Sequence, residues 1–359
     1  MKRMNIKRIY RGSEHISGTY AVRIILMLAI VSLFISCASA PEKPQFDLVW
    51  PLPPDEPKVK FVDFFYSSLD LGKKTGIADT LFGQERIEAF VKPYGVAVDR
   101  EGSIYITDVG KIVVFDLKKK DYSVLGSEPG LGQLRIPIGI AIAVDGRIFV
   151  GDTAADRVYV YKNGKYSNTL GSTGEMESPS GVALDEQRKL IYVSDSIKHY
   201  VLVYSLDDYR LVKKIGERGT ADGKFNFPTN IALDREGKLY VVDTGNNRVQ
   251  IFDASGKFVG AFGKIGDTGG SFARPKGIAI DSEGHIYVVD AAFQNIQIFD
   301  QKGQLLLFVG SGGQPPGKFM LPAGITIDQD DKIYVVDQVP GSIQIFQYLG
   351  EKYKKIQQQ

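Results

Sequence analysis

Six aspartates recur along the chain at nearly equal intervals, and a regular series of carboxylates is the first candidate for chemistry. Each ends a short β-branched and aromatic run and follows the previous one by 43–48 residues: Asp108, Asp152, Asp195, Asp243, Asp290 and Asp337. Gathered at one place, such groups would suit acid–base catalysis or a divalent cation. Because one stands in every copy of a repeat, we expect a structural role instead. An aspartate at a strand end accepts hydrogen bonds from backbone N–H groups of the following loop.

Histidine and serine offer little further catalytic chemistry. After the first 36 residues only His199 and His285 remain, and they fall at opposite ends of predicted strands. Zinc catalysis ordinarily uses three protein ligands and an open fourth position, which two histidines on opposite rims do not supply. No serine stands in a nucleophile-elbow pattern. The residues therefore predict no catalytic set, no metal site and no cofactor.

A side chain that changes from copy to copy follows each of these aspartates by a few positions. The series is Lys111, Arg157, His199, Arg248, Asn295 and Ser342. We expect the cations among them to pair with the aspartates. They also make one rim of the predicted fold more basic over the first four copies than over the last two.

The elements that position these side chains form a unit that occurs six times. In residues 227–252 it consists of three short apolar runs, 231–233, 239–243 and 249–252, separated by a glycine turn and a polar loop. Such runs predict consecutive strands joined by tight turns. Each unit opens with a proline, at intervals of 42–49 residues: Pro93, Pro137, Pro179, Pro228, Pro275 and Pro322. A period in the forties with several strands per unit predicts an all-β protein, a single β-propeller with six four-stranded antiparallel blades.

Composition also predicts the order of strands within a blade. The Gly-Ile-Ala-Ile runs are small or aliphatic and should line the crowded central channel, whereas segments such as 257–262 should be outermost. Residues 58–65 resemble such an outer strand but follow no repeat. We therefore predict that they supply the fourth strand of the last blade and close the ring. Residues 348–356 are the alternative for that place.

The repeat resembles that of the NHL-repeat family, whose unit runs Pro-x-Gly-Ile-Ala-Val-Asp, Gly-x-Ile-Tyr-Val-x-Asp, Asn-x-Arg-Ile-Gln-Val-Phe. Residues 228–252 match it almost throughout, and the resemblance covers about 90–348. The departures are local. Asn230 stands where the other copies have glycine, Ala143 and Asp145 shift the acid of the second copy, and the loop 109–111 is short.

The resemblance also implies enzymatic relatives. The family includes lyases that hold zinc through several histidines, and lactonase-like propellers are similar folds that coordinate a divalent cation with channel carboxylates and asparagine. In this chain the x of Pro-x-Gly is predicted at the channel mouth, and the six residues there include no carboxylate: Tyr94, Ile138, Ser180, Thr229, Lys276 and Ala323.

Residues 1–36 have the pattern of a lipoprotein-type signal peptide. The apolar run 24–35 follows basic residues and is shorter than the roughly twenty apolar residues that span a bilayer. Residues 33–37, Leu-Phe-Ile-Ser-Cys, resemble a lipobox, with Phe34 where leucine is usual. The resemblance implies that Cys37, the only cysteine, is lipidated and anchors the protein to a membrane. The alternative is an ordinary signal peptide with an incidental cysteine.

A proline-rich segment, 37–57, is expected to act as a tether between this anchor and a propeller that spans 58–359. Trp50 lies in the tether and is expected to pack there or on the propeller. As a whole the chain resembles a bacterial NHL-repeat lipoprotein. The resemblance implies an exported protein that faces the periplasm or the extracellular side, on the outer membrane if the cell is Gram-negative.

The charge balance argues against nucleic acid as a partner. The chain has 44 basic and 42 acidic residues, but six basic residues and one acidic residue lie in the first 36. The remainder has 38 basic and 41 acidic groups, a net charge of −3. A mildly acidic body has no general field for a polyanion.

Function is best sought where the six copies differ, because residues common to all of them build blades. The candidate binding residues on the predicted loop-rich rim are Tyr94, Arg157, His199, Arg248, Lys276 and Phe293. Loops on a rigid scaffold are common recognition sites, and an exposed aromatic such as Phe293 is enriched at interfaces. We expect a non-enzymatic binding or scaffold protein of the cell envelope whose partner is a protein, a peptide or a glycan. The alternative is an envelope hydrolase or lyase with a metal-assisted site at the channel mouth.

Overall fold

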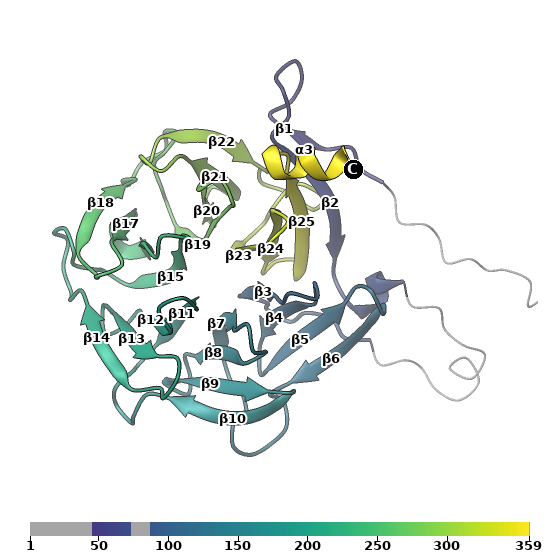
Figure 1. The fold of residues 1–359 in the computed structure, drawn as a ribbon. Helices are drawn as coiled ribbons and strands as arrows, with labels where there is room; N and C mark the ends of the chain where they lie inside the picture. Colours follow the sequence, from purple (N-terminus) through teal and green to yellow (C-terminus); the bar gives the residue numbers. More distant parts are fainter. Residues whose placement is uncertain (1–44, 73–86, 359) are drawn as a thin grey trace, which may run out of the picture. The chain divides into compact units, whose positions relative to one another are not determined.

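Six antiparallel sheets surround one axis in the computed structural model, which describes residues 45–72 and 87–358 (Figure 1). Five of these sheets have four strands that follow one another in sequence, so each repeat forms one blade. Blades are numbered as their repeats are. The first strands of neighbouring blades contact one another around the central channel, as their composition predicts.

The strands of blades 1–5 follow one another from the channel outward. Blades 1 and 2 contain β3 (Val96–Val98), β4 (Ile104–Asp108), β5 (Lys111–Asp116), β6 (Asp121–Leu125), β7 (Pro137–Ile142), β8 (Ile148–Asp152), β9 (Arg157–Lys162) and β10 (Lys165–Leu170). Blade 3 contains β11 (Pro179–Asp185), β12 (Leu190–Asp195), β13 (Tyr200–Ser205) and β14 (Leu211–Ile215). Blades 4 and 5 contain β15 (Pro228–Leu233), β16 (Leu239–Asp243), the 3-10 turn η2 (Thr244–Asn246), β17 (Arg248–Phe252), β18 (Phe258–Phe262), β19 (Pro275–Ile280), β20 (Ile286–Asp290), β21 (Asn295–Phe299) and β22 (Leu305–Val309).

The last blade joins the two ends of the described chain. Its first three strands are β23 (Pro322–Ile327), β24 (Lys332–Asp337) and β25 (Ser342–Tyr348), and its fourth is β2 (Val59–Phe65). β2 runs antiparallel to β25, with Val59 opposite Tyr348 and Phe65 opposite Ile343. This is the place expected for residues 58–65. The alternative segment instead ends β25 and forms the helix α3 (Glu351–Gln357).

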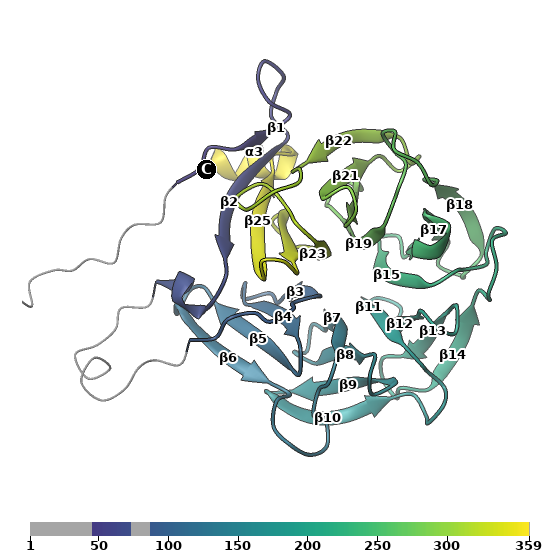
Figure 2. The same cartoon turned by 180° about the vertical axis from the view of Figure 1, so that it is seen from behind.

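The propeller begins earlier than the sequence predicts. One compact unit covers Phe46–Gln359, not 58–359, because part of the expected tether pairs with the sheet. β1 (Val49–Trp50) is a fifth strand beside β2, visible in Figures 1 and 2. The Trp50 ring lies 5.6 Å from the Phe346 ring. Strand pairing and the packing of Trp50 therefore hold this part of the expected tether against the blade. The 3-10 turn η1 (Ser68–Leu71) follows β2.

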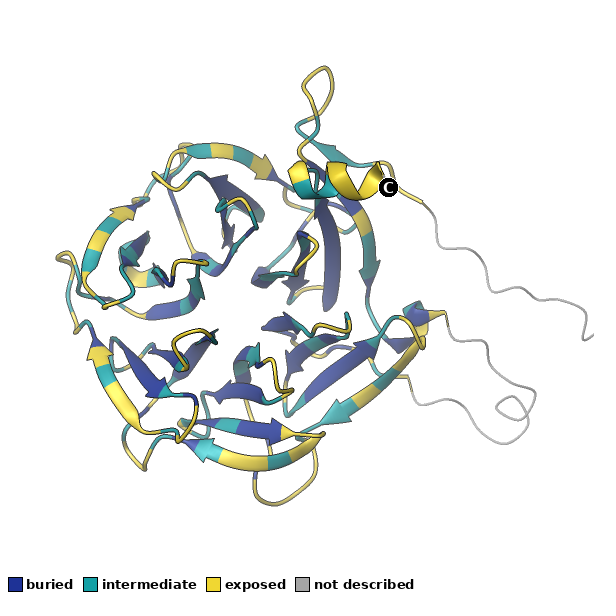
Figure 3. Cartoon of the chain, in the orientation of Figure 1, coloured by how far each residue is buried: buried dark blue, intermediate teal, exposed yellow. Residues whose placement is uncertain are grey.

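The hydrophobic core of the described residues lies between blades. Six clusters of buried side chains occupy the six junctions between neighbouring sheets. Alternate residues of β16 show why the strands are apolar on both sides. Leu239 and Val241 pack toward blade 3, whereas Tyr240 and Val242 pack toward blade 5. The outermost strands β14, β18 and β22 have exposed positions on one face (Figure 3).

The strand directions define two rims. The loop rim carries the loops that follow the six aspartates and the loops that enter the first strands. The turn rim carries the hairpin turns between first and second strands and between third and fourth strands. No helix in the described part of the chain is long and apolar enough to cross a bilayer. The apolar run 24–35 and Cys37 lie outside the described residues.

Candidate functional site

The strand-end aspartates are buried and hold the loops of their own blades together. Asp290 accepts hydrogen bonds from the N–H groups of Ala273 (2.8 Å) and Arg274 (3.1 Å), which precede β19. It also accepts them from Ala292 (2.9 Å) and Phe293 (3.1 Å), which follow β20. Blades 1, 2, 3 and 6 repeat this pattern. The expected structural role is confirmed, and it extends to the loop before the first strand.

Blade 4 departs from this pattern because its aspartate binds the side chain of Arg248, one of the candidate binding residues. Asp243 accepts an N–H from Asn226 at 2.7 Å, and its other oxygen accepts from Arg248 Nε at 2.9 Å and Gln250 Nε2 at 3.0 Å. The Arg248 guanidinium also donates to the carbonyl of Ala221 at 2.8 Å. Arg248 is therefore a brace for the loop before β15, with little of its side chain open to solvent.

His199 of blade 3 contacts the loop before β15, the loop that Arg248 also binds. Its Nδ1 accepts the N–H of Phe227 at 3.0 Å, and the two rings lie 4.8 Å apart. Phe227 has φ 51°, a left-handed conformation that is uncommon for a bulky residue. Burial and the nearby Arg218 lower the pKa of His199, which favours the neutral ring that this hydrogen bond requires. His199 is thus a junction residue and is buried.

Two further candidates lie apart from the channel. Arg157 is half-buried and donates from Nε to the carbonyl of Ala155 at 3.0 Å, not to the aspartate of its blade. Phe293 is half-buried in the loop after β20. Of the six candidate binding residues, the structure brings only Tyr94 and Lys276 together in one pocket.

That pocket opens on the loop rim at the mouth of the channel, and we call it the channel-mouth pocket. It encloses about 200 Å³ between blades 5, 6, 1 and 2. Its lining consists of apolar side chains, one tyrosine, one glutamine and three cations: Lys92, Tyr94, Val109, Ile136, Pro137, Ile138, Arg274, Lys276, Ala291, Leu321, Pro322, Ala323 and Gln338. No carboxylate from the described part of the chain contributes to it.

The three cations of the channel-mouth pocket have no ion-pair partner among residues 45–72 and 87–358. Lys92 and Arg274 are exposed, whereas Lys276 is half-buried. Burial and the proximity of Arg274 lower the pKa of Lys276 to about 8. Placing a cation in a partly desolvated site costs free energy unless an opposite charge compensates. The pocket is therefore electrostatically prepared for an anion.

Asn230 contacts this pocket's residues from the side of the channel. Its Nδ2 donates to the carbonyl of Lys276 at 3.0 Å, and its side chain lies near the Tyr94 hydroxyl. Burial raises the pKa of Tyr94 to about 12, so the hydroxyl stays protonated at neutral pH. Tyr94 lines the channel-mouth pocket and Asn230 lines the channel beneath it. These two residues therefore lie where the pocket and the channel adjoin.

The other five blades have glycine at this position because neighbouring strands approach closely. A Cβ added to any of these glycines would lie closer than 3.0 Å to the carbonyl oxygen of the next blade's Pro-x-Gly segment: Gly95, Gly139, Gly181, Gly277 and Gly324. At Asn230 a side-chain hydrogen bond replaces this backbone approach. The departure noted in the sequence is therefore the feature that joins blade 4 to the floor of the pocket.

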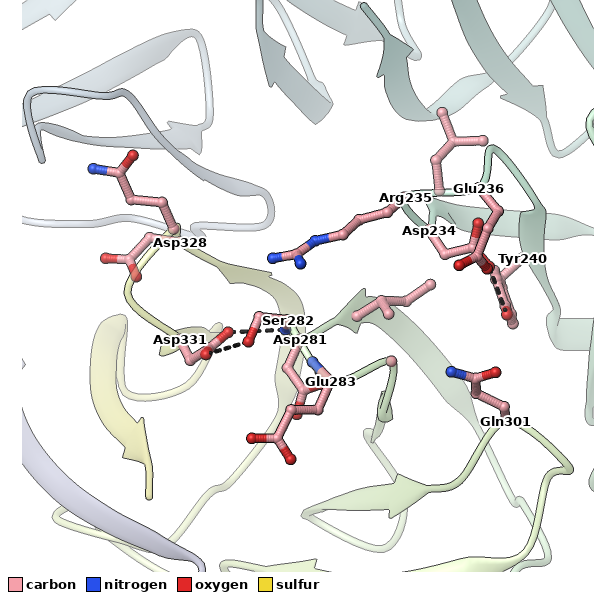
Figure 4. A pocket seen from close by; sticks show the side chains of 14 residues that line it. Asp234, Arg235, Glu236, Tyr240, Asp281, Ser282, Glu283, Gln301, Asp328 and Asp331 are labelled. Carbon is pink, nitrogen blue, oxygen red and sulfur yellow. Dashed lines mark hydrogen bonds between the residues drawn. The ribbon is translucent and has the colours of Figure 1, made fainter. Parts of the chain in front are cut away.

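A second pocket lies on the turn rim between blades 4, 5 and 6 and is rich in acids (Figure 4). It encloses about 290 Å³. The Arg235 side chain points toward its middle, with Asp331 and Ser282 across from it (Figure 4). Both carboxylate oxygens of Asp331 accept from Ser282, from its N–H at 2.9 Å and its hydroxyl at 2.7 Å.

The other acids of this turn-rim pocket also stabilise their own turns. Asp234, Asp281 and Asp328 each accept N–H groups of the hairpin and a tyrosine hydroxyl, at 3.2, 3.0 and 2.9 Å respectively. Glu283 accepts the Tyr348 hydroxyl at 3.0 Å and the N–H at the start of α3. These carboxylates build the hairpins and anchor the C-terminal helix.

Neither pocket has the donor set of a propeller metal site. The channel-mouth pocket offers cations and apolar groups, which repel a divalent ion. In the described ranges, no three His, Cys, Asp or Glu side chains form a group that could hold a metal ion. His199 and His285 lie on opposite rims. A cation-assisted mechanism like that implied by lactonase-like relatives therefore does not fit the residues at this channel mouth.

Sequence reasoning identified Tyr94 and Lys276 but did not assign Arg274 and Lys92 to the same site. Both precede the proline that opens their repeat, where other copies have uncharged residues. This difference between the copies is the sequence signal that could have assigned Lys92 and Arg274 to the site. The pocket itself was not evident, because its lining runs from residue 92 to residue 338 and meets only when the ring closes.

Comparison with known families agrees with this architecture. The family described as SMP-30/Gluconolactonase/LRE-like region matches residues 71–263, more than half of the chain. The chain belongs to this family. Residues 282–358 match a second family described as a 6-bladed beta-propeller. The NHL resemblance and the six-bladed fold are confirmed at this level.

Curated relatives of this SMP-30-like chain match only part of it. Human NHL repeat-containing protein 3 is 29% identical over 110 residues, which cover 28% of this chain and 32% of that protein. The B-box type zinc finger protein ncl-1 of Caenorhabditis elegans is 42% identical over 45 residues, or 12% of this chain and 5% of that protein. The chain thus spans about a third of the first relative.

Solved structures with the same fold have diverse functions. A streptogramin B lyase has 18% identity and a TM-score of 0.53, covering 74% of this chain and 85% of its own. A gluconolactonase from Xanthomonas campestris has 16% identity and a TM-score of 0.56, covering 72% and 86%. An auxiliary nutrient binding protein from Bacteroides thetaiotaomicron has 14% identity and a TM-score of 0.57, covering 72% and 69%. At such identities the likeness shows the fold alone.

Proposed function

We propose that this SMP-30-like propeller is a non-enzymatic binding or scaffold protein of the cell envelope that engages its partner through the loop rim. The partner is a protein, a peptide or a glycan. The observation that carries this proposal is the channel-mouth pocket, whose cations have no counter-charge among the described residues while the aspartates of the blades are engaged in their own loops. A pocket whose cations can pair with a charged ligand, and whose lining holds no recognisable group of catalytic residues, suits binding.

Location is part of the proposal. The signal-like segment 1–36 and the lipobox-like residues before Cys37 support export and lipid anchoring. The Cys37→Ala protein should then be released into the soluble fraction after cell lysis, whereas the wild type stays with membranes. Co-fractionation of Cys37→Ala with membranes at wild-type yield refutes the acyl anchor.

Affinity capture from a detergent-solubilised cell-envelope fraction tests the binding role. The wild type should retain a reproducible partner, and Arg274→Gln and Phe293→Ala on the loop rim should retain severalfold less. Lys302→Met is the matched control, since Lys302 is exposed in a hairpin turn of the turn rim. Retention of no partner, or equal loss with all three variants, argues against a loop-rim scaffold.

The second candidate is an envelope hydrolase or lyase with a metal-assisted site at the channel mouth. Family membership alone favours it, because solved propellers of similar fold include a lyase and a gluconolactonase, whereas the described residues at the channel mouth do not suit a divalent cation. Metal analysis of the purified, folded protein separates the two candidates. Zinc or calcium bound tightly at one ion per chain would support the enzyme and count against the binding module.

A further inference from the structure

The channel-mouth pocket combines two kinds of surface in a small volume. Arg274 and Lys276 of blade 5 stand on one side, with Lys92 of blade 1 nearby. Apolar side chains of blades 1, 2 and 6 complete the wall, among them Val109 and Ile136, each with 48% of its surface exposed. The two kinds of group lie close enough to contact one small molecule at the same time.

The volume limits what enters. Pockets for drug-sized ligands usually enclose roughly 300–1,000 Å³, and this one encloses about 200 Å³. Tyr94 lines this pocket, and Asn230, near its hydroxyl, lines the channel below. A pocket of this volume therefore takes one compact group of a ligand.

The positive charge of the channel-mouth pocket favours an anionic ligand. Lys276 is half-buried and has no ion-pair partner in the described part of the chain, and the pocket lining contains no Asp, Glu or His. An ammonium group so placed gains more from a carboxylate than an exposed lysine does, because desolvation strengthens the pair. The apolar wall in turn favours a carboxylate attached to a hydrocarbon group over a bare anion.

We propose that the channel-mouth pocket binds a carboxylate joined to a compact apolar group, with Arg274 and Lys276 holding the carboxylate and Val109 and Ile136 covering the hydrocarbon. This chemistry occurs in free short-chain or branched acids and at the C-terminus of a peptide that ends in an apolar residue. The inference rests on the proposed binding function and specifies the ligand class of the same site.

The protonation of Lys276 provides a second readout. Its pKa of about 8 reflects burial and the positive charge of Arg274, and the other titratable groups facing it are Lys92 and Tyr94. A bound carboxylate raises this pKa, so binding takes up a proton above pH 8. Affinity should therefore fall as the pH rises from 7 to 9.5 in the wild type. In Lys276→Met the affinity should change little over this range.

Isothermal titration calorimetry with 4-methylpentanoate tests the proposal directly. The wild type should bind it at least tenfold more tightly than acetate, which lacks the apolar group, or 4-methylpentan-1-ol, which lacks the charge. Lys276→Met and Arg274→Gln should each lose at least tenfold. Arg235→Met, which removes a cation pointing into the turn-rim pocket, should bind as the wild type does.

A peptide arm identifies the source of the carboxylate. Acetyl-Gly-Gly-Leu with a free C-terminus is compared with its C-terminal amide. Tighter binding of the free peptide than of 4-methylpentanoate indicates a chain end, and the reverse indicates a small acid. The proposal is overturned if acetate binds as tightly as 4-methylpentanoate, if Lys276→Met binds normally, or if the folded wild type binds none of the probes.

These outcomes are separable from the proposed function. Envelope capture that persists while 4-methylpentanoate and the peptides fail to bind leaves the scaffold role standing and rejects the ligand class. Melting curves verify that each variant is folded. Lys276→Met should melt at or above the wild-type temperature at pH 7, because it removes an uncompensated half-buried charge.

Discussion

His199 and His285 lie on opposite rims and have pKa values shifted in opposite directions. Burial and Arg218 lower the pKa of His199. The hydrogen bond of the His285 ring to Asp281, at 2.8 Å, raises the pKa of His285. A lowered pKa means that the unfolded chain binds protons more readily, so His199 stabilises the fold above pH 6.5 and loses this effect as the pH falls through its folded pKa. His285 stabilises it below pH 6.5 and loses this effect as the pH rises through its folded pKa.

Two single variants should separate these effects. His199→Asn keeps a residue that tolerates the left-handed backbone (φ 58°) and should lose less unfolding free energy than the wild type between pH 7.5 and 5.5. His285→Gln should lose more, by about 1 kcal/mol, because it lacks the charged hydrogen bond that forms in acid. Urea denaturation at the two pH values measures both. The same pH dependence in all three proteins would show that neither histidine is coupled to folding.

At the scale of the elements, the first strands of the blades are joined by close backbone contacts. Glycine is needed where a strand meets the next blade's carbonyl, and Asn230 makes the one departure in the described ring by donating a hydrogen bond instead. Thr107 and Thr244 add bonds of 2.9 Å to carbonyls of the following blade. The geometry of the channel mouth is therefore set by inter-blade contacts, not by the loops alone.

Paired glycine substitutions test this close approach. Gly277→Ala should destabilise the protein by about 2–3 kcal/mol, because the new Cβ would overlap the carbonyl of Ala323. Gly260→Ala is the control. Its Cβ would meet nothing within 4 Å in the outer strand β18, so it should be neutral or stabilise by up to about 1 kcal/mol. Similar losses in the two variants, measured by thermal unfolding, would rule out the proposed crowding.

The added strand β1 contributes to the blade through its aromatic side chain. Trp50 packs against the cluster between blades 5 and 6, so Trp50→Ala should cost about 2–3 kcal/mol of unfolding free energy. Leu52, two residues later, is 71% exposed, and Leu52→Ala should change stability little. Chemical denaturation of both variants tests this. If Trp50→Ala is as stable as the wild type, residues 46–57 are only a tether.

For the whole molecule, the repeat was the predictable part. Alternating apolar residues in each copy bury both faces of a sheet, so six sheets had to stack in a ring, and β2 fills the remaining outer place. The boundary at Phe46 was missed because proline content suggested a tether, whereas packing of Trp50 decides the conformation. The pairing of Arg248 with Asp243 follows the predicted spacing, whereas the contacts of Arg248 and His199 with the loop before β15 join residues that spacing does not relate.

The candidate site could be predicted only in part. Tyr94 and Lys276 stood out because they differ from the small or uncharged residues of other copies. That no described carboxylate lies in the pocket with Lys276 depends on which blades meet at the channel mouth, and this is a property of the closed ring. Substitutions at Lys276 should therefore change binding, whereas substitutions at Arg235 on the other rim should not.

Competitive lysine acylation, read by mass spectrometry, tests most directly whether the protein functions through the channel mouth. With limiting reagent at pH 7.5, the acylation rates of Lys276 and of Lys302 on the turn rim are measured with and without the solubilised envelope fraction. We predict that Lys276 labels severalfold more slowly when its partner is present, while the exposed Lys302 labels at an unchanged rate. Unchanged labelling of Lys276, or protection confined to Lys302 and its rim, would contradict the account.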